Sequence, residues 1–155
     1  PTISYDPGGE AFRDPAGVAE ATRHVDFLLL NSNELKAITG GVGYEHASRL
    51  IGGRVKLVVV KAGVEGAYAV GDNGVVYMAN PPPRVRVVDV TGAGDSFNAA
   101  FLVWLKSGRS IGESLRAGVA AGTAKVARMG SSNMPSLAEV VELLGSTPPC
   151  RVLRA

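Results

Sequence analysis

The sequence is poor in the residues that build disulfides, zinc clusters and membrane spans. It has one cysteine, Cys150, and two histidines, so no internal disulfide can form and no His/Cys zinc cluster is indicated. No apolar run approaches the roughly 18 residues of a transmembrane helix, and the N-terminus lacks a signal-peptide pattern. The net charge is +2, with lysines and arginines scattered along the chain. These absences argue against nucleic-acid or membrane partners and predict a soluble, cytoplasmic protein.

The 155 residues are enough for one domain with a buried core, and the 46% hydrophobic content argues against disorder. The chain begins at Pro1 and a strand pattern follows at once, at residues 2–5. We therefore expect the back part of a longer protein, with residues 1–145 in the domain and 146–155 as a C-terminal tail.

Short apolar runs typical of buried strands alternate with helical periodicity. Strands are predicted at residues 2–5, 25–30, 56–61 and 85–88, and a hairpin with arms at 66–70 and 75–78. Helices are predicted at 15–23, 33–39, 44–51, 96–105, 110–128 and 136–145. The last two helices open with capping boxes, Ser110-x-x-Glu113 and Ser136-x-x-Glu139. This alternation predicts an α/β layer fold with a mostly parallel sheet and one antiparallel hairpin.

A glycine turn opens the helix predicted at 96–105. In Thr91-Gly92-Ala93-Gly94-Asp95, bare backbone N–H groups meet the positive end of a helix dipole, which suits a phosphate. Asp95 adds a carboxylate beside that phosphate, and a phosphate cradle with a base is what phosphoryl transfer to an alcohol requires. The alternative is structural, with Asp95 a favourable acid in a first helical turn and the glycines a loop.

Two further motifs follow buried strands, at the sheet edge where α/β proteins bind ligands. Asn31 and Glu34 are oxygen donors suited to a hydrated Mg²⁺, although Asn-x-x-Glu also resembles a helix cap. Gly63 and Gly66, after Lys61, allow a nucleotide to approach the backbone closely, or form a plain turn into the hairpin.

Several common nucleotide-binding and catalytic signatures are missing. There is no P-loop, and Phe97 stands where the Rossmann pattern needs its third glycine. The His-Arg-Asp and Asp-Phe-Gly motifs of protein kinases and the Gly-x-Ser-x-Gly turn of hydrolases are also missing.

The three motifs together resemble the ribokinase-type carbohydrate kinases, the PfkB family. Residues 88–101 are similar throughout to that family's C-terminal signature, Asn31-x-x-Glu34 resembles its Asn-x-x-Glu motif, and residues 61–66 resemble its nucleotide-binding glycine turn. The motifs occur in family order. The resemblance implies a ribokinase-like three-layer α/β/α fold whose N-terminal half and lid are absent from this chain.

The resemblance also implies roles for particular residues. Asp95 would be the catalytic base, and the backbone N–H groups of Gly92, Ala93, Gly94 and Asp95 would form the anion hole for the γ-phosphate. Asn31 and Glu34 would act on Mg²⁺ and the phosphates, largely through water. The implied ATP-binding residues are Asn31, Lys61, Gly63, Gly66 and Gly94.

The family often has a monovalent cation beside the anion hole. Asp89 and Thr91 match positions used there, and the carbonyls of Lys125, Arg128 and Gly130 are further candidates. The loop at 131–135 looks longer than the family's common form, so dependence on K⁺ is left open.

The resulting hypothesis is an ATP-dependent kinase that transfers the γ-phosphoryl group to a hydroxyl of a small sugar or nucleoside. One alternative is a vitamin kinase of the same superfamily, acting on hydroxymethylpyrimidine or pyridoxal. The other is a nucleotide-binding module that does not turn over, because the substrate half is absent. The expected partners of this chain are ATP, the sugar or nucleoside, and either the missing N-terminal half or a second copy of the chain.

Overall fold

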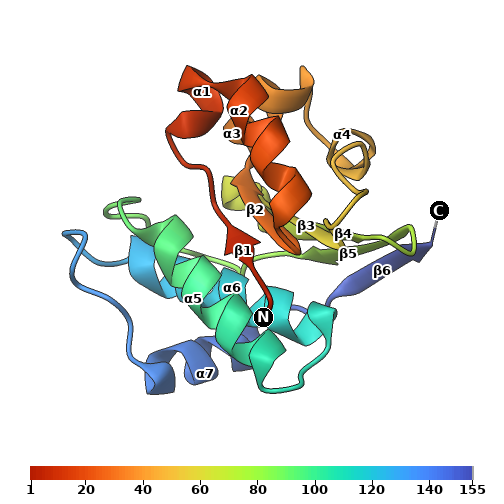
Figure 1. Ribbon diagram of the computed structural model, residues 1–155. Helices are drawn as coiled ribbons and strands as arrows, with labels where there is room; N and C mark the ends of the chain where they lie inside the picture. Colours follow the sequence, from red (N-terminus) through yellow and green to blue (C-terminus); the bar gives the residue numbers. More distant parts are fainter. Residues whose placement is uncertain (155) are drawn as a thin grey trace. The chain divides into compact units, whose positions relative to one another are not determined.

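The computed structural model describes residues 1–154, apart from the side chain of Arg154, and shows a six-stranded sheet with helices (Figure 1). The strands follow one another in the sheet in chain order. They are β1 (Ser4–Tyr5), β2 (Phe27–Asn31), β3 (Leu57–Lys61), β4 (Ala67–Gly71), β5 (Val75–Ala79) and β6 (Arg151–Arg154). The helices are α1 (Glu10–Arg13), α2 (Pro15–Ala21), α3 (Ser32–Thr39), α4 (Tyr44–Ser48), α5 (Ala93–Lys106), α6 (Ile111–Val126) and α7 (Leu137–Ser146), with short 3₁₀ turns at Thr22–His24 and Gly63–Glu65.

The sheet is mixed. β1 pairs with β2 and β2 with β3 in parallel, and the β2–β3 register aligns Phe27 with Leu57 and Asn31 with Lys61. β4 and β5 are neighbours joined by a tight turn, in which the Gly74 N–H donates to the Gly71 carbonyl at 3.0 Å. The predicted hairpin is therefore confirmed. The parallel strand pairs are those of β1 with β2 and of β2 with β3.

The strand predicted at residues 85–88 is wrong. This segment has no regular secondary structure, and Val87 and Val88 are exposed. The Val88 N–H donates at 2.7 Å to the carbonyl of Val126, at the end of α6. β-Branched residues favour a strand only where a neighbouring strand is available to pair with, and here the backbone bonds to a helix end instead.

The helix predictions hold apart from their ends. Both serine capping boxes are present, at Ser110 before α6 and at Ser136 before α7. The helix predicted at 44–51 is shorter, ending at Ser48, and α1 was not predicted. Residues 151–154, within the predicted tail, form β6.

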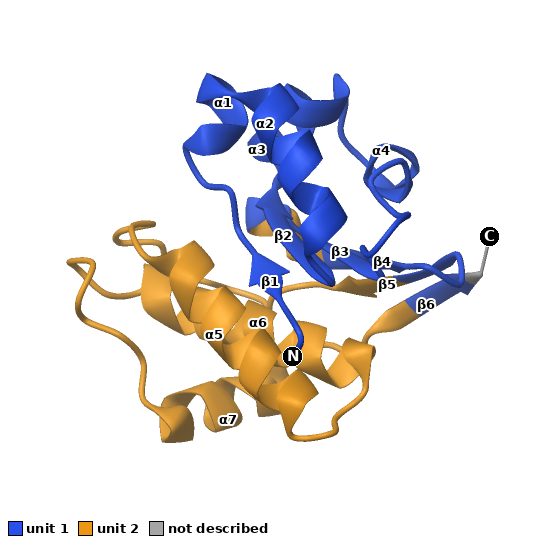
Figure 2. Ribbon diagram, viewed as in Figure 1, with its two compact units in different colours: residues 1–63, 68–76, 152–155 blue, residues 64–67, 77–151 orange. Residues whose placement is uncertain are grey.

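The chain divides into two compact units (Figure 2). Unit 1 comprises residues 1–63, 68–76 and 152–155, and unit 2 comprises residues 64–67 and 77–151. In unit 1 the core is built on β2 and β3, whose central residues Leu28–Leu30 and Val58–Val60 are almost fully buried. Such unbroken apolar runs are typical of parallel strands covered on both faces.

In unit 2, α5 packs against α6 and α6 against α7. Phe97 and Phe101 are buried on one side of α5, and their rings stack with centroids 6.1 Å apart. A Cβ at Gly118 of α6 would lie 2.9 Å from the Phe97 ring, so the glycine is what allows the two helices to approach. The small residue in α6 therefore accommodates the aromatic side chain of α5.

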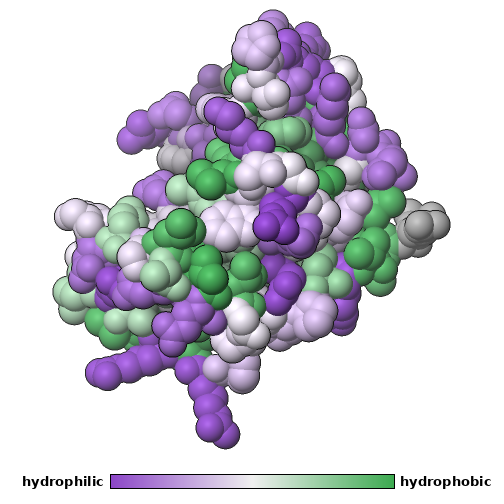
Figure 3. Space-filling view, turned by 90° about the horizontal axis from the view of Figure 1, so that it is seen from below, coloured by the Kyte–Doolittle hydropathy of each residue, from purple (hydrophilic) through white to green (hydrophobic). Residues whose placement is uncertain are grey.

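Other apolar side chains of unit 2 remain at the surface. Val103 of α5 and Leu137 and Val141 of α7 are all more than half exposed. Figure 3 shows such apolar areas interspersed with polar ones on the face seen from below. Within residues 1–154, no helix is both long enough and apolar enough to cross a membrane.

Candidate active site

The turn at residues 89–92 ends in a glycine that the geometry requires. Gly92 has φ +80°, in the left-handed region, and precedes the first residue of α5. A Cβ at this position would lie 3.2 Å from the carbonyl oxygen of Ser131 and 3.3 Å from Cε of Lys125. Both the backbone conformation and the tight space therefore disfavour a side chain here.

The start of α5 offers donors for an anion. No side chain caps this helix, and the N–H groups of Gly94 and Asp95 have no earlier helical residue to bond to. The N–H of Ala93, also expected in the anion hole, instead donates to the Val90 carbonyl at 3.2 Å. The helix dipole places partial positive charge at the same end. Asp95 lies exposed in the first turn, so its carboxylate stands next to these donors. An oxyanion at this point would meet backbone donors on one side and a base on the other.

Asp89 ties the turn to the loop after α6. Its carboxylate accepts the N–H of Thr91 through Oδ1 and the N–H of Gly130 through Oδ2, each at 2.9 Å. The N–H and hydroxyl of Thr91, then the N–H of Gly130 and the positive charge of Lys125, together lower the pKa of Asp89 to about 2. Asp89 therefore stays ionised throughout the physiological range and holds the turn in place.

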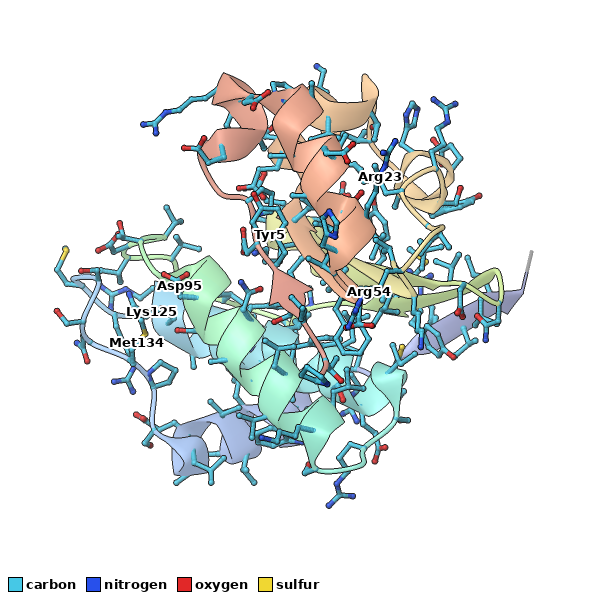
Figure 4. The ribbon with its side chains drawn as sticks, in the orientation of Figure 1. Tyr5, Arg23, Arg54, Asp95, Lys125 and Met134 are labelled. Atoms are coloured by element: carbon cyan, nitrogen blue, oxygen red, sulfur yellow. The ribbon has the colours of Figure 1, made fainter. Side chains whose placement is uncertain are left out.

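Lys125 of α6 lies beside the same turn. Its side chain is 0% exposed, and its Nζ has no hydrogen-bond partner among the described residues. The sequence pattern pointed only to the carbonyl of Lys125, which accepts the Arg128 N–H at 3.0 Å. In Figure 4, Asp95, Lys125 and Met134 lie near the same end of α5. The side chain was missed because a single lysine in a small-residue helix gives no sign that it is buried.

In unit 1, Asn31 and Glu34 form a capping box at the start of α3. The Asn31 side chain accepts the N–H groups of Asn33 and Glu34, and Glu34 Oε2 accepts the Asn31 N–H at 2.7 Å. Glu34 is only 5% exposed. Burial raises its pKa and nearby Asp6 raises it further, against the opposing effects of the Asn31 N–H and Lys61. The capping alternative is thus confirmed, and the role toward Mg²⁺ stays a prediction.

Lys61 stands next to Asn31 at the carboxyl ends of two paired strands. Its ammonium forms an ion pair with Asp6 Oδ2 at 2.5 Å. The sequence pattern did not mark Asp6 as a site residue. Because Asp6 directly follows β1, which is parallel to β2, the argument from strand ends could have found it.

The two glycines after Lys61 have different environments. Gly63, in unit 1, has φ +59° and open space where a Cβ would be, which leaves its backbone accessible. Gly66, in unit 2, has φ +93°, and a Cβ there would lie 2.1 Å from the Ala79 carbonyl oxygen. The need for glycine at position 66 is therefore explained by packing against the end of β5.

Most of the predicted residues, together with Asp6, accordingly fall into two clusters. Unit 1 brings together Asp6, Asn31, Glu34 and Lys61, while unit 2 brings together Asp89, Thr91, Gly92, Lys125 and Gly130, with Asp95 beside the turn. Within residues 1–154, no three His, Cys, Asp or Glu side chains are grouped to hold a metal by themselves. A divalent ion here would need waters and phosphate oxygens as further ligands, as Mg²⁺ commonly does.

A family model for "pfkB family carbohydrate kinase" matches residues 5–137, which is most of the chain. The chain belongs to the pfkB family of carbohydrate kinases.

Individual relatives agree with this assignment. A 5-dehydro-2-deoxygluconokinase of Bacillus licheniformis is 38% identical over 109 residues, covering 70% of this chain and 33% of the relative. The structure of Arabidopsis thaliana ribokinase complexed with ribose and ATP is 30% identical with a TM-score of 0.81, covering 92% of this chain and 47% of that one. Phosphofructokinase-2 of Escherichia coli in complex with potassium is 26% identical with a TM-score of 0.79, covering 93% and 47%.

The structural matches confirm the predicted ribokinase-like α/β fold. This chain spans a third of the sequence relative's length and just under half of each structural neighbour.

Proposed function

We propose that this pfkB-family chain carries the ATP-binding and catalytic part of a kinase that transfers the γ-phosphoryl group of ATP to a hydroxyl of a small sugar. The observation that carries this proposal is Asp95 in the first turn of α5, beside the N–H groups that follow left-handed Gly92. The names of the relatives, a 5-dehydro-2-deoxygluconokinase and a ribokinase, favour a sugar acceptor over a nucleoside.

In this proposal the acceptor hydroxyl donates its proton to the Asp95 carboxylate as its oxygen bonds to the γ-phosphorus. The bond from that phosphorus to the bridging oxygen breaks, and ADP leaves with the electron pair. Negative charge on the three phosphoryl oxygens faces the N–H groups of Gly92, Gly94 and Asp95. Donors fixed by the turn stabilise this charge without reorganising, and in many enzymes such electrostatic stabilisation accounts for most of the rate enhancement.

The unit 1 cluster suits the polyphosphate and its metal. Glu34 and Asp6 provide carboxylate oxygens and Asn31 an amide, the donors that Mg²⁺ prefers, although Glu34 Oε2 already accepts the Asn31 N–H. These residues therefore fit an ion held largely through water. Bound Mg²⁺ would neutralise phosphate charge, while Lys61 and the open backbone at Gly63 would line the nucleotide.

A second candidate function is a nucleotide-binding module without turnover. The observation that favours it is the length of the chain, which spans less than half of each kinase compared with it. The vitamin-kinase alternative draws no such support from these relatives, which are named as sugar kinases.

Calorimetry with Mg-ATP, followed by ADP release against a panel of sugars, tests the proposal. Micromolar binding with acceptor-dependent ADP release is the expected result. Binding without ADP release under any acceptor would select the module, and absence of binding would contradict both functions.

A further inference from the structure

The buried ammonium of Lys125 is the least satisfied charge that the described residues contain. The side chain is 0% exposed, and no hydrogen bond or ion pair to Nζ occurs within residues 1–154. Burying a charge without a partner is strongly destabilising. A lysine that bears this cost in the resting protein is best explained by an anion that arrives during function.

The position of Lys125 identifies that anion. Its Cε lies 3.3 Å from the point where a Cβ of Gly92 would be, so the ammonium end of the side chain borders the turn that leads into α5. Asp89 is the acid of this turn, yet its two carboxylate oxygens already accept the N–H groups of Thr91 and Gly130. The helix start, with its unbonded N–H groups, is the adjoining place where a phosphate would bind.

The same region is where the family resemblance expects a free monovalent cation. The residues present do not fit one, because a fixed positive charge from Lys125 already lies beside Asp89 and Gly92. A second cation bordering this buried ammonium would be repelled by it.

We propose that Lys125 is a tethered cation, whose ammonium supplies the positive charge behind the phosphate-binding turn and makes a free monovalent cation unnecessary. This inference rests on the proposed function in one respect, that the anion at the turn is a phosphate of the nucleotide. Lys125 is thereby a positioning residue for the turn and its phosphate, and Asp95 remains the proposed base.

The first test compares Mg-ATP affinity of the chain in potassium chloride and in tetramethylammonium chloride at equal ionic strength. The wild-type affinity is expected to agree within about twofold. Lys125→Met should weaken binding about 10- to 100-fold in both salts, the value of a charge-assisted contact. Lys106→Met, the same change at an exposed lysine of α5, is the matched control and should bind as the wild type.

A second readout needs no nucleotide. Lys125→Met should raise the melting temperature, because it replaces an unpaired buried charge by an apolar side chain of similar volume. Lys125→Ala leaves room beside Asp89, and its melting temperature should rise in potassium chloride relative to tetramethylammonium chloride. The wild-type melting temperature should show no such dependence on K⁺.

The outcomes separate the two proposals. Two results would contradict the proposed role of Lys125 and leave the proposed function standing. One is a K⁺-specific rise in the wild-type melting temperature, and the other is an unchanged Mg-ATP affinity of Lys125→Met. Wild-type chain that binds no Mg-ATP in either salt would overturn the proposed function, and the melting temperatures alone would then decide the role of Lys125.

Discussion

Asp89 Oδ2 accepts the backbone N–H of Gly130 at 2.9 Å, a contact between residues 41 positions apart in the chain. The other oxygen of the same carboxylate accepts the N–H of Thr91. One side chain thus joins the turn before α5 to the loop after α6. Gly92 ends this turn, with Lys125 beside it, so Asp89 holds in place the turn to which the phosphate is proposed to bind.

Asp89→Asn should lower the melting temperature at neutral pH. An amide keeps one acceptor oxygen but turns an NH₂ group toward one of two N–H donors. The folded-state pKa of Asp89 is lowered to about 2, so its contribution to stability is present above the unfolded pKa near 3.8 and is lost as the pH falls toward 2. Melting temperatures measured between pH 7 and pH 2 should therefore converge for wild type and variant.

Asp72→Asn, at an exposed aspartate in the turn after β4, serves as the control. It should follow the wild type at every pH. A constant difference between wild type and Asp89→Asn across the range would contradict the charge-dependent role of Asp89.

Gly92→Ala should destabilise the chain more than Gly108→Ala. The two glycines have nearly the same backbone conformation, with φ +80° and +85°, and the strain of a side chain there costs about 1–3 kcal/mol. Only at Gly92 would the new Cβ also crowd Ser131 and Lys125, whereas Gly108 has open space. Urea denaturation of both variants measures the difference, and equal losses would show that crowding at the turn is unimportant.

Glu34→Gln and Glu113→Gln should change stability in opposite directions, although both glutamates close capping boxes. Burial raises the folded-state pKa of Glu34, so its ionised form costs stability at pH 7 and the glutamine variant should melt higher. The hydroxyl and N–H of Ser110 lower the pKa of Glu113, so its charge stabilises the fold at pH 7 and Glu113→Gln should melt lower.

Scanning calorimetry at pH 7 and again below pH 4 measures the change in melting temperature of each variant relative to the wild type. Each difference should shrink in acid, where the wild-type glutamates become protonated. Glu34→Gln should also weaken Mg²⁺-dependent nucleotide binding, an effect that Glu113→Gln should lack.

Asp95→Asn should abolish phosphoryl transfer while Mg-ATP binding survives. Removal of a general base typically costs roughly 10²–10⁴-fold in rate, and the N–H donors of the turn come from the backbone and are unchanged. The measurement is ADP release with an active acceptor, beside a binding titration. Loss of nucleotide binding together with turnover would show that Asp95 positions the phosphate and is not the base.

The sequence by itself determined the local elements and the motifs. Capping residues and apolar periodicity act over a few neighbouring positions, so the capping boxes at Ser110 and Ser136 could be predicted directly. The turn at Gly92–Asp95 was likewise visible, because glycines and an acid at a helix start have a local physical cause.

Only the tertiary structure decided what depends on distant partners. The apolar segment 85–88 has the composition of a strand, yet its backbone bonds to the end of α6. Asp6 became a site residue only when β1 paired with β2 and brought it to Lys61. Lys125 reads as an ordinary helical lysine, and its burial beside Gly92 follows from how α5, α6 and the loop at 130–134 pack. Burial, and with it the charge balance at the turn, is set by packing between segments far apart in the chain.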